Sequence, residues 1–126
     1  MSNRKLHFET IQIHGGYKVD ESLARGIAIH PTAAYHFSSC DYAANLFTLS
    51  EPGYIYTRLH IPTTAAYEER IAALYGGVGA LATASGMSAI LLTVTALAKA
   101  GDNIVASPYL YGGTHNQFVI SLRNLG

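Results

Sequence analysis

The sequence predicts an α/β fold in which helices cover a parallel sheet, with an extended arm ahead of it. In the second half, segments with helical periodicity alternate with short apolar runs that lack polar alternation. Such runs are typical of strands that are buried on both faces. The predicted order is helix, strand, helix, strand, helix, which is one βαβ unit with flanking helices. Two strands are too few for a stable parallel sheet, so we expect part of a larger α/β domain.

The first half, residues 1–61, is interrupted by Gly and Pro and predicts an arm that packs on a larger body. One short helix is expected over 41–49, with Asp41 as its N-cap. Residues 62–126 are expected to form the first part of the α/β domain.

The first predicted helix of the second half begins at Thr63-Thr64 and ends before Gly76-Gly77. Three consecutive charged residues of this helix are expected to form a solvated face: Glu68, Glu69 and Arg70. The apolar run 78–84 predicts the first strand.

A turn at Ser85-Gly86-Met87 precedes a second predicted helix that runs to Ala100. The second strand is expected over 103–107. After a loop over 108–113, Thr114 is expected to cap a third helix.

Composition excludes several classes of function. The 126 residues have a formal net charge of zero, so nucleic-acid binding has no electrostatic support. Only 13% of the residues are charged, against about 25% in typical domains. We therefore expect part of the surface to be covered by another subunit or by further sequence.

No segment predicts export, a membrane span or a metal site. The most apolar stretch, 89–98, has about half of the roughly twenty residues that a span requires. Cys40 is the only cysteine, and the six His residues are scattered. A reducing, cytoplasmic location is the expectation.

The turn at Ser85, Gly86 and Met87 is the first candidate site. Ligands of α/β proteins bind beyond the carboxyl ends of the strands, and unpaired N–H groups of a helix start suit phosphate. The alternative is that Ser85 only caps the helix and Gly86 only permits a tight turn.

Two aromatic candidates accompany this turn. Tyr111, followed by two glycines, would stack on a flat ligand or use its hydroxyl, unless it is simply a packed aromatic. Tyr56 and Arg58 project from one side of an extended segment and would clamp a phosphate. The alternative for Arg58 is a surface arginine with a salt-bridge partner.

Taken together, these motifs resemble the Cys/Met-metabolism (trans-sulfuration) family of pyridoxal 5'-phosphate (PLP) enzymes. The resemblance covers nearly the whole chain. It rests on Tyr-Thr-Arg at 56–58, Pro-Thr-Thr at 62–64, Glu-Arg-Ile-Ala-Ala-Leu at 69–74, Ala-Thr-Ala-Ser-Gly-Met at 82–87, Gly-Asp-Asn-Ile-Val at 101–105 and Leu-Tyr-Gly-Gly-Thr at 110–114. The stretches 43–47 and 111–118 are most similar to the O-acetylhomoserine sulfhydrylase branch.

The resemblance implies the large domain of the aspartate-aminotransferase type, a small amino-acid substrate and a sulfur donor. It implies that Gly86 and Met87 hold the cofactor phosphate, with Ser85 beside them, and that Tyr111 stacks on the ring and assists proton movement. Tyr56 and Arg58 would reach the phosphate in a neighbouring subunit of a dimer of dimers. No nucleic-acid or membrane partner is implied.

The Schiff-base Lys of the family is not matched in this chain, where Lys5, Lys18 and Lys99 are the only lysines. We therefore expect an N-terminal fragment that is inactive alone. The alternatives are a non-catalytic truncated product, another branch (cystathionine gamma-synthase or methionine gamma-lyase), or a small phosphate-binding module.

Overall fold

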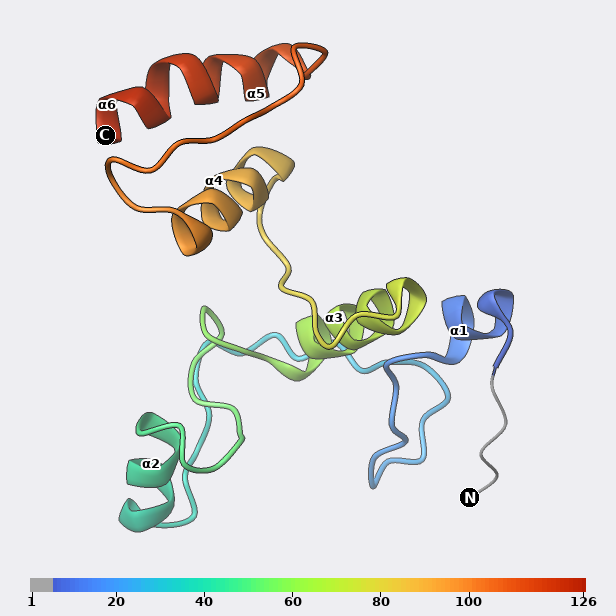
Figure 1. The fold of residues 1–126 in the computed structure, drawn as a ribbon. Coiled ribbons are helices and arrows are strands. Elements are labelled where there is room, and N and C mark those ends of the chain that lie inside the picture. Colours follow the sequence, from blue (N-terminus) through green and yellow to red (C-terminus); the bar gives the residue numbers. More distant parts are fainter. Residues whose placement is uncertain (1–5) are drawn as a thin grey trace. The chain divides into compact units, whose positions relative to one another are not determined.

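The computed structural model describes residues 6–126, which form two compact units that divide between Leu81 and Ala82 (Figure 1). The first unit holds α1 (Phe8–His14), α2 (Cys40–Phe47) and α3 (Pro62–Tyr75). The second unit holds α4 (Gly86–Leu97), α5 (Gly112–Asn116), the π-helix η1 (Gln117–Leu122) and α6 (Arg123–Leu125). The predicted division at 61/62, between an arm and the first part of an α/β domain, stays a prediction.

The two predicted strands are wrong for the part of the chain that the structure describes. Residues 78–84 and 103–107 contain no strand. Val78 and Val105 are almost completely exposed. A strand exists only where a neighbour completes its hydrogen-bond ladder, and no described residue pairs with either segment in this way. The apolar composition of these segments favours a strand but does not supply the neighbouring strand that each would need.

Helix α3 has the predicted end but a different start. Pro62 is its first residue, because a proline there lacks only an N–H that would be unpaired anyway. Gly76 ends the helix in the left-handed conformation, with φ of 65°. Thr63 does not cap the helix. Its hydroxyl accepts from the His30 N–H over 2.9 Å and donates to the Ala28 carbonyl over 3.3 Å.

The other predicted helices differ from the structure by a few residues. Ser39, not Asp41, is the N-cap of α2, and its side chain accepts from the Tyr42 N–H. Helix α4 ends at Leu97 rather than at Ala100, because Ala98 is extended, with φ of −132°.

The third predicted helix also begins earlier than expected. Helix α5 starts at Gly112, two residues before Thr114, and Tyr111 is its N-cap. It continues without a break into the π-helix η1 and then α6. Tyr111 makes no side-chain cap at this helix start. Threonine is a preferred N-cap residue, so the sequence favoured Thr114 as the N-cap of the helix.

Helix α1 was not predicted, since it has seven residues, no side-chain cap and no buried side chain. Short helices form when they dock on another element, and α1 packs on α3. Gly16, just after α1, approaches α3 so closely that a Cβ would lie 2.4 Å from the Ala66 carbonyl oxygen. Arg70 of α3 donates from Nε to the Gly15 carbonyl over 2.7 Å.

The expected solvated face of α3 is partly wrong. Glu68 is only 8% exposed, and its carboxylate lies 3.7 Å from Nδ1 of His60. Arg70 is half-buried under the end of α1, whereas Glu69 is exposed as predicted. Helix α3 therefore has neighbours on the side where its sequence suggested solvent.

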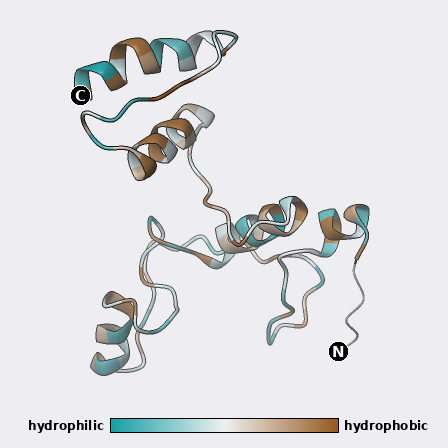
Figure 2. Cartoon of the chain, viewed as in Figure 1, coloured by the Kyte–Doolittle hydropathy of each residue, from teal (hydrophilic) through white to brown (hydrophobic). Residues whose placement is uncertain are grey.

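The buried apolar core among residues 6–126 is small and lies in the first unit, at Leu46, Ala65 and Ala66. Helix α4 is largely hydrophobic (Figure 2) and yet has no buried residue. Leu92 and Leu97 of this helix are 49% and 82% exposed. This uncovered apolar surface agrees with the expectation from the low charge content. Across the described residues, no helix is both long and apolar enough to span a bilayer.

Candidate phosphate-binding site

The first turn of α4 is organised by Ser85. Its Oγ accepts from the Ser88 N–H over 3.1 Å and lies 2.9 Å from the Ser88 hydroxyl. The Ser85 carbonyl accepts the hydroxyl of Thr83 over 2.9 Å and the Ala89 N–H over 3.0 Å. Ser85 is therefore the N-cap of α4, as the alternative interpretation of this turn described it.

This capping leaves two N–H groups, those of Gly86 and Met87, without a hydrogen-bond partner among residues 6–126. They are the first two N–H groups of a twelve-residue helix, where the helix dipole favours negative charge. A Cβ placed on Gly86 would meet nothing within 4 Å. The donors and the open space in front of them fit a phosphate group.

Met87 lies close to the start of α5. A Cβ on Gly113 would be 3.3 Å from the Met87 sulfur and 2.7 Å from Cε1 of Tyr111. Gly113 is therefore required for the ring of Tyr111 to lie where it does. Tyr111 is 76% exposed, so its ring is available to a ligand. Met87 and Tyr111, both predicted site residues, thus approach the same side of Gly113.

Tyr56 and Arg58 lie together in the first unit. The Arg58 guanidinium carbon is 5.7 Å from the centre of the Tyr56 ring, which is cation–π distance. The extended segment that was expected ends at Tyr56, because the carbonyl of Tyr56 accepts from the N–H groups of Leu59 and His60. The residues share a side as predicted, but a turn brings them together.

The segment around Tyr56 is held on residues 32–35. Tyr56 and Ala34 form an isolated antiparallel bridge. The Thr57 N–H donates to the Ala33 carbonyl over 2.9 Å, and the Thr57 hydroxyl donates to the Thr32 carbonyl. Arg58 is exposed and has no carboxylate partner in the part of the chain that the structure describes. Its charge is therefore free to meet an anion.

Two residues near the phosphate site were missed by the sequence reasoning. The Thr114 hydroxyl lies 4.0 Å from the Met87 sulfur, and Nε2 of Gln117 donates to the Met87 carbonyl over 3.3 Å. Their spacing of three places them on one helix face, but they belong to the continuous polar run 114–117, so the sequence did not distinguish them from their neighbours.

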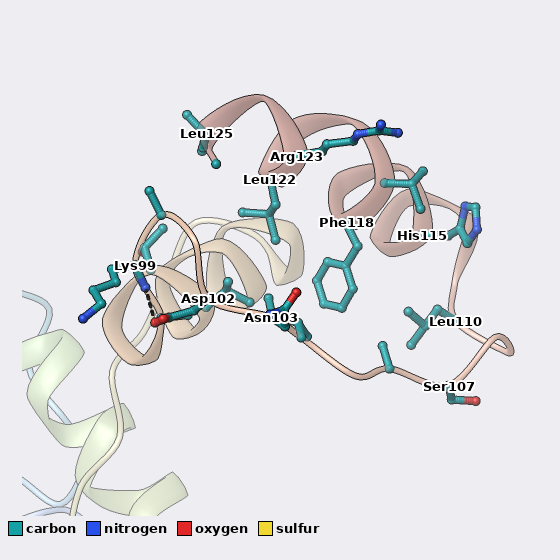
Figure 3. A pocket seen from close by; sticks show the side chains of 18 of the residues that line it. Lys99, Asp102, Asn103, Ser107, Leu110, His115, Phe118, Leu122, Arg123 and Leu125 are labelled. Carbon is teal, nitrogen blue, oxygen red and sulfur yellow. Dashed lines mark hydrogen bonds between the residues drawn. The ribbon is translucent and has the colours of Figure 1, made fainter.

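A cavity of about 590 Å³ lies in the second unit but contains none of the predicted site residues. It is lined by the end of α4, residues 98–110 and the helices from α5 to α6. Phe118 and Leu122 point into it, whereas Arg123 points away (Figure 3). At its edge, the Lys99 N–H donates to the Asp102 carboxylate over 3.0 Å. The predicted strand 103–107 lines this cavity as irregular chain.

No group of three or more potential metal ligands (His, Cys, Asp or Glu) occurs among the residues that the structure describes. Cys40 is exposed at the start of α2.

Comparison with known proteins decides the family. The sequence model of the family described as "Cys/Met metabolism PLP-dependent enzyme" matches residues 9–126. The chain belongs to this family. Residue motifs had indicated the same family, and that prediction is confirmed.

Two named relatives are similar to the chain over nearly its whole length. The homocysteine synthase of Schizosaccharomyces pombe is 51% identical over 121 residues, which are 95% of this chain and 28% of the relative. The O-acetyl-L-homoserine sulfhydrylase 1 of Thermus thermophilus is 53% identical over 122 residues, 96% of this chain and 29% of the relative. The chain thus spans less than a third of the length of these relatives.

A solved structure supports the predicted fold class. It is a Campylobacter jejuni protein described as a putative O-acetylhomoserine (thiol)-lyase that contains N'-pyridoxyl-lysine-5'-monophosphate. The match has a TM-score of 0.93 at 37% identity and covers 97% of this chain and 30% of the other. The chain therefore has the fold of the N-terminal part of a PLP-dependent transferase.

Proposed function

We propose that the chain is the N-terminal part of an O-acetylhomoserine sulfhydrylase. Such an enzyme replaces the acetate group of O-acetylhomoserine with a sulfur nucleophile: the bond from the γ-carbon to the ester oxygen breaks, a bond to sulfur forms, and acetate leaves. With sulfide the product is homocysteine. The observation that carries the proposal is about 50% identity over nearly the whole chain to relatives named for this activity.

The cofactor of the family, PLP, stabilises negative charge on the substrate carbons when it is bound. Residues of the second unit would hold it. The N–H groups of Gly86 and Met87 would donate to the phosphate, with Ser85 fixing the turn, and the exposed ring of Tyr111 would stack on the pyridine. The Tyr111 hydroxyl would move a proton at the substrate.

Tyr56 and Arg58 would bind the phosphate in a neighbouring subunit. The unpaired guanidinium of Arg58 supports this role, because it can donate two parallel hydrogen bonds to an anion. The role requires a homodimer at least, and a pair of such dimers is the proposed assembly. Cytoplasmic location belongs to the same proposal.

The test uses the complete protein, expressed from its full reading frame. We expect the combined change of Arg58→Ala and Gly86→Asp to weaken PLP binding by at least about tenfold, since each change removes or opposes a charge-assisted contact. PLP affinity is measured by absorbance titration. Unchanged affinity would overturn the site assignment.

Turnover is a separate readout of the proposed reaction. Formation of homocysteine from O-acetylhomoserine and sulfide supports the sulfhydrylase. Reaction only with cysteine as the nucleophile would instead indicate a cystathionine gamma-synthase. Breakdown of methionine would indicate a methionine gamma-lyase.

A second candidate is a non-catalytic product that pairs with a separately encoded chain bearing the Schiff-base Lys. A partner chain would supply cover for the exposed Leu92 and Leu97 of α4, as further sequence of the same chain would in the first proposal. The mass of the protein in its native cells distinguishes the enzyme from the non-catalytic product. A mass of about three times this chain supports the enzyme, and a mass equal to this chain supports the non-catalytic product.

A further inference from the structure

Gln117 and Thr114 both contact Met87. Gln117 contacts the backbone of Met87, and Thr114 contacts its sulfur. Nε2 of Gln117 donates to the Met87 carbonyl across a separation of thirty residues, and the buried Thr114 hydroxyl reaches the Met87 sulfur. The two side chains are three residues apart and so share one helix face. Helix α5 packs on α4, and Gln117 of η1 reaches the first turn of α4 through its side chain.

The peptide group between Met87 and Ser88 is therefore fixed at both ends. Its N–H donates to Ser85 Oγ over 3.1 Å, and its carbonyl accepts from Gln117 Nε2 over 3.3 Å. The two N–H groups without partners, those of Gly86 and Met87, lie immediately before this peptide. Their direction follows from the orientation of the turn that Ser85 and Gln117 hold.

The backbone of Gln117 is also unusual. Gln117 is the first residue of the π-helix η1, which interrupts an otherwise α-helical run from Gly112 to Leu125. π-Helical turns are rare and occur frequently at functional sites. A π-helical turn widens the helix, so the side chains beyond it take directions that a continuous α-helix would not give them.

The amide of Gln117 is only partly satisfied. Its Oε1 is buried and has no hydrogen-bond partner among the described residues. Reversing the amide would bring this oxygen against the Met87 carbonyl oxygen, so the orientation is set by Met87. An apolar side chain of the same size would avoid the unsatisfied oxygen. The donation to Met87 is therefore the contact that distinguishes glutamine from such a side chain.

We propose that Gln117 is a positioning residue for phosphate binding: it fixes the first turn of α4 so that the Gly86 and Met87 N–H groups face the phosphate. This inference rests on the proposed function, because it assumes that the phosphate of PLP binds at this turn. Gln117 itself does not touch the phosphate. It acts through the Met87–Ser88 peptide.

The test compares two ligands on the complete protein: PLP, and pyridoxal, which lacks the phosphate. Gln117→Met keeps the length of the side chain and removes the donor. We expect PLP affinity to fall by about fivefold, the usual order for one lost hydrogen bond, and pyridoxal affinity to stay unchanged. Asn116→Met is the matched control, since Asn116 is exposed and adjacent, and both affinities should be unchanged.

Gln117→Asn is the second variant, in case the first does not fold. It keeps the amide but shortens its reach, so the same selective loss of PLP affinity is expected. Equal losses for PLP and pyridoxal, or a lower melting temperature with both affinities intact, would overturn the inference and assign Gln117 to packing alone. If Arg58→Ala with Gly86→Asp leaves PLP binding unchanged, the proposed site itself is wrong.

Discussion

Nε of Arg70 donates a hydrogen bond to the backbone carbonyl of Gly15 over 2.7 Å, although the two residues are 55 positions apart. This contact ties the end of α1 to the middle of α3. It forms where Gly16 turns the chain with φ of 68° directly against α3. The N-terminal segment is thereby anchored on the helix that begins at Pro62.

Substitution of Gly16 tests this close approach. Gly16→Ala is expected to reduce the free energy of unfolding by about 3 kcal/mol or more, because it combines backbone strain with a Cβ that would lie 2.4 Å from the Ala66 carbonyl oxygen. Gly76→Ala separates the two causes, since Gly76 has φ of 65° but open space, and a cost of about 1–2 kcal/mol is expected.

Gly26→Ala completes the series as the control. Gly26 has no positive φ and no neighbour within 4 Å, so a change within about 0.5 kcal/mol is expected. Denaturant unfolding of the complete protein measures all three. A loss for Gly16→Ala no larger than that for Gly76→Ala would contradict the close approach.

Two serine N-caps allow capping and ligand binding to be separated. Ser85 and Ser39 each accept from the N–H three residues later, over 3.1 and 3.0 Å. Ser85→Ala and Ser39→Ala are each expected to lower the free energy of unfolding by about 1 kcal/mol. Only Ser85→Ala should also weaken PLP binding, because only α4 is proposed to hold the phosphate. Thermal unfolding and PLP titration check this, and equal effects of both variants on PLP affinity would refute it.

Thr57 is expected to support Tyr56 and Arg58. Its hydroxyl donates to the Thr32 carbonyl and so holds the turn that places Arg58 over the Tyr56 ring. Thr57→Val keeps the shape and removes the donor, so PLP affinity should fall several-fold, as for one hydrogen bond worth about 1 kcal/mol. Thr57→Ser keeps the hydroxyl and should behave as the unaltered protein does. Titration with PLP measures both, and a loss in Thr57→Ser equal to that in Thr57→Val would rule out the hydroxyl as the cause.

Tyr54 gives a prediction about alkaline pH. Burial raises the pKa of the Tyr54 phenol, and the charges of Glu69 and Tyr35 raise it further. The folded protein therefore binds this proton more tightly than the unfolded chain does. The contribution of this proton to the free energy of unfolding is fully present below the ordinary tyrosine pKa, and it is lost as the pH rises through the raised pKa.

We expect Tyr54→Phe to flatten the fall of melting temperature with alkaline pH, since the phenylalanine has no proton to lose. Tyr75→Phe is the control, because Tyr75 is 86% exposed. Melting curves at a series of alkaline pH values measure both variants. Parallel curves for Tyr54→Phe and the unaltered protein would contradict the prediction.

The sequence by itself determined the features that depend on residues close together in the chain, such as where helices begin and end. Gly76 ends α3 because it accepts a positive φ, and Ser85 starts α4 because its hydroxyl accepts a backbone N–H. The family followed from short motifs in a fixed order. Each of these signals lies within a few residues of the feature that it predicts.

Only the tertiary structure decided which residues far apart in the chain meet. The docking of α1 on α3, the burial of Glu68 and the contact of Gln117 with Met87 all join distant segments. Helical periodicity identifies a face but not what covers that face. The predicted strands are wrong here for the same reason, because a strand needs a ladder partner that its own residues cannot supply.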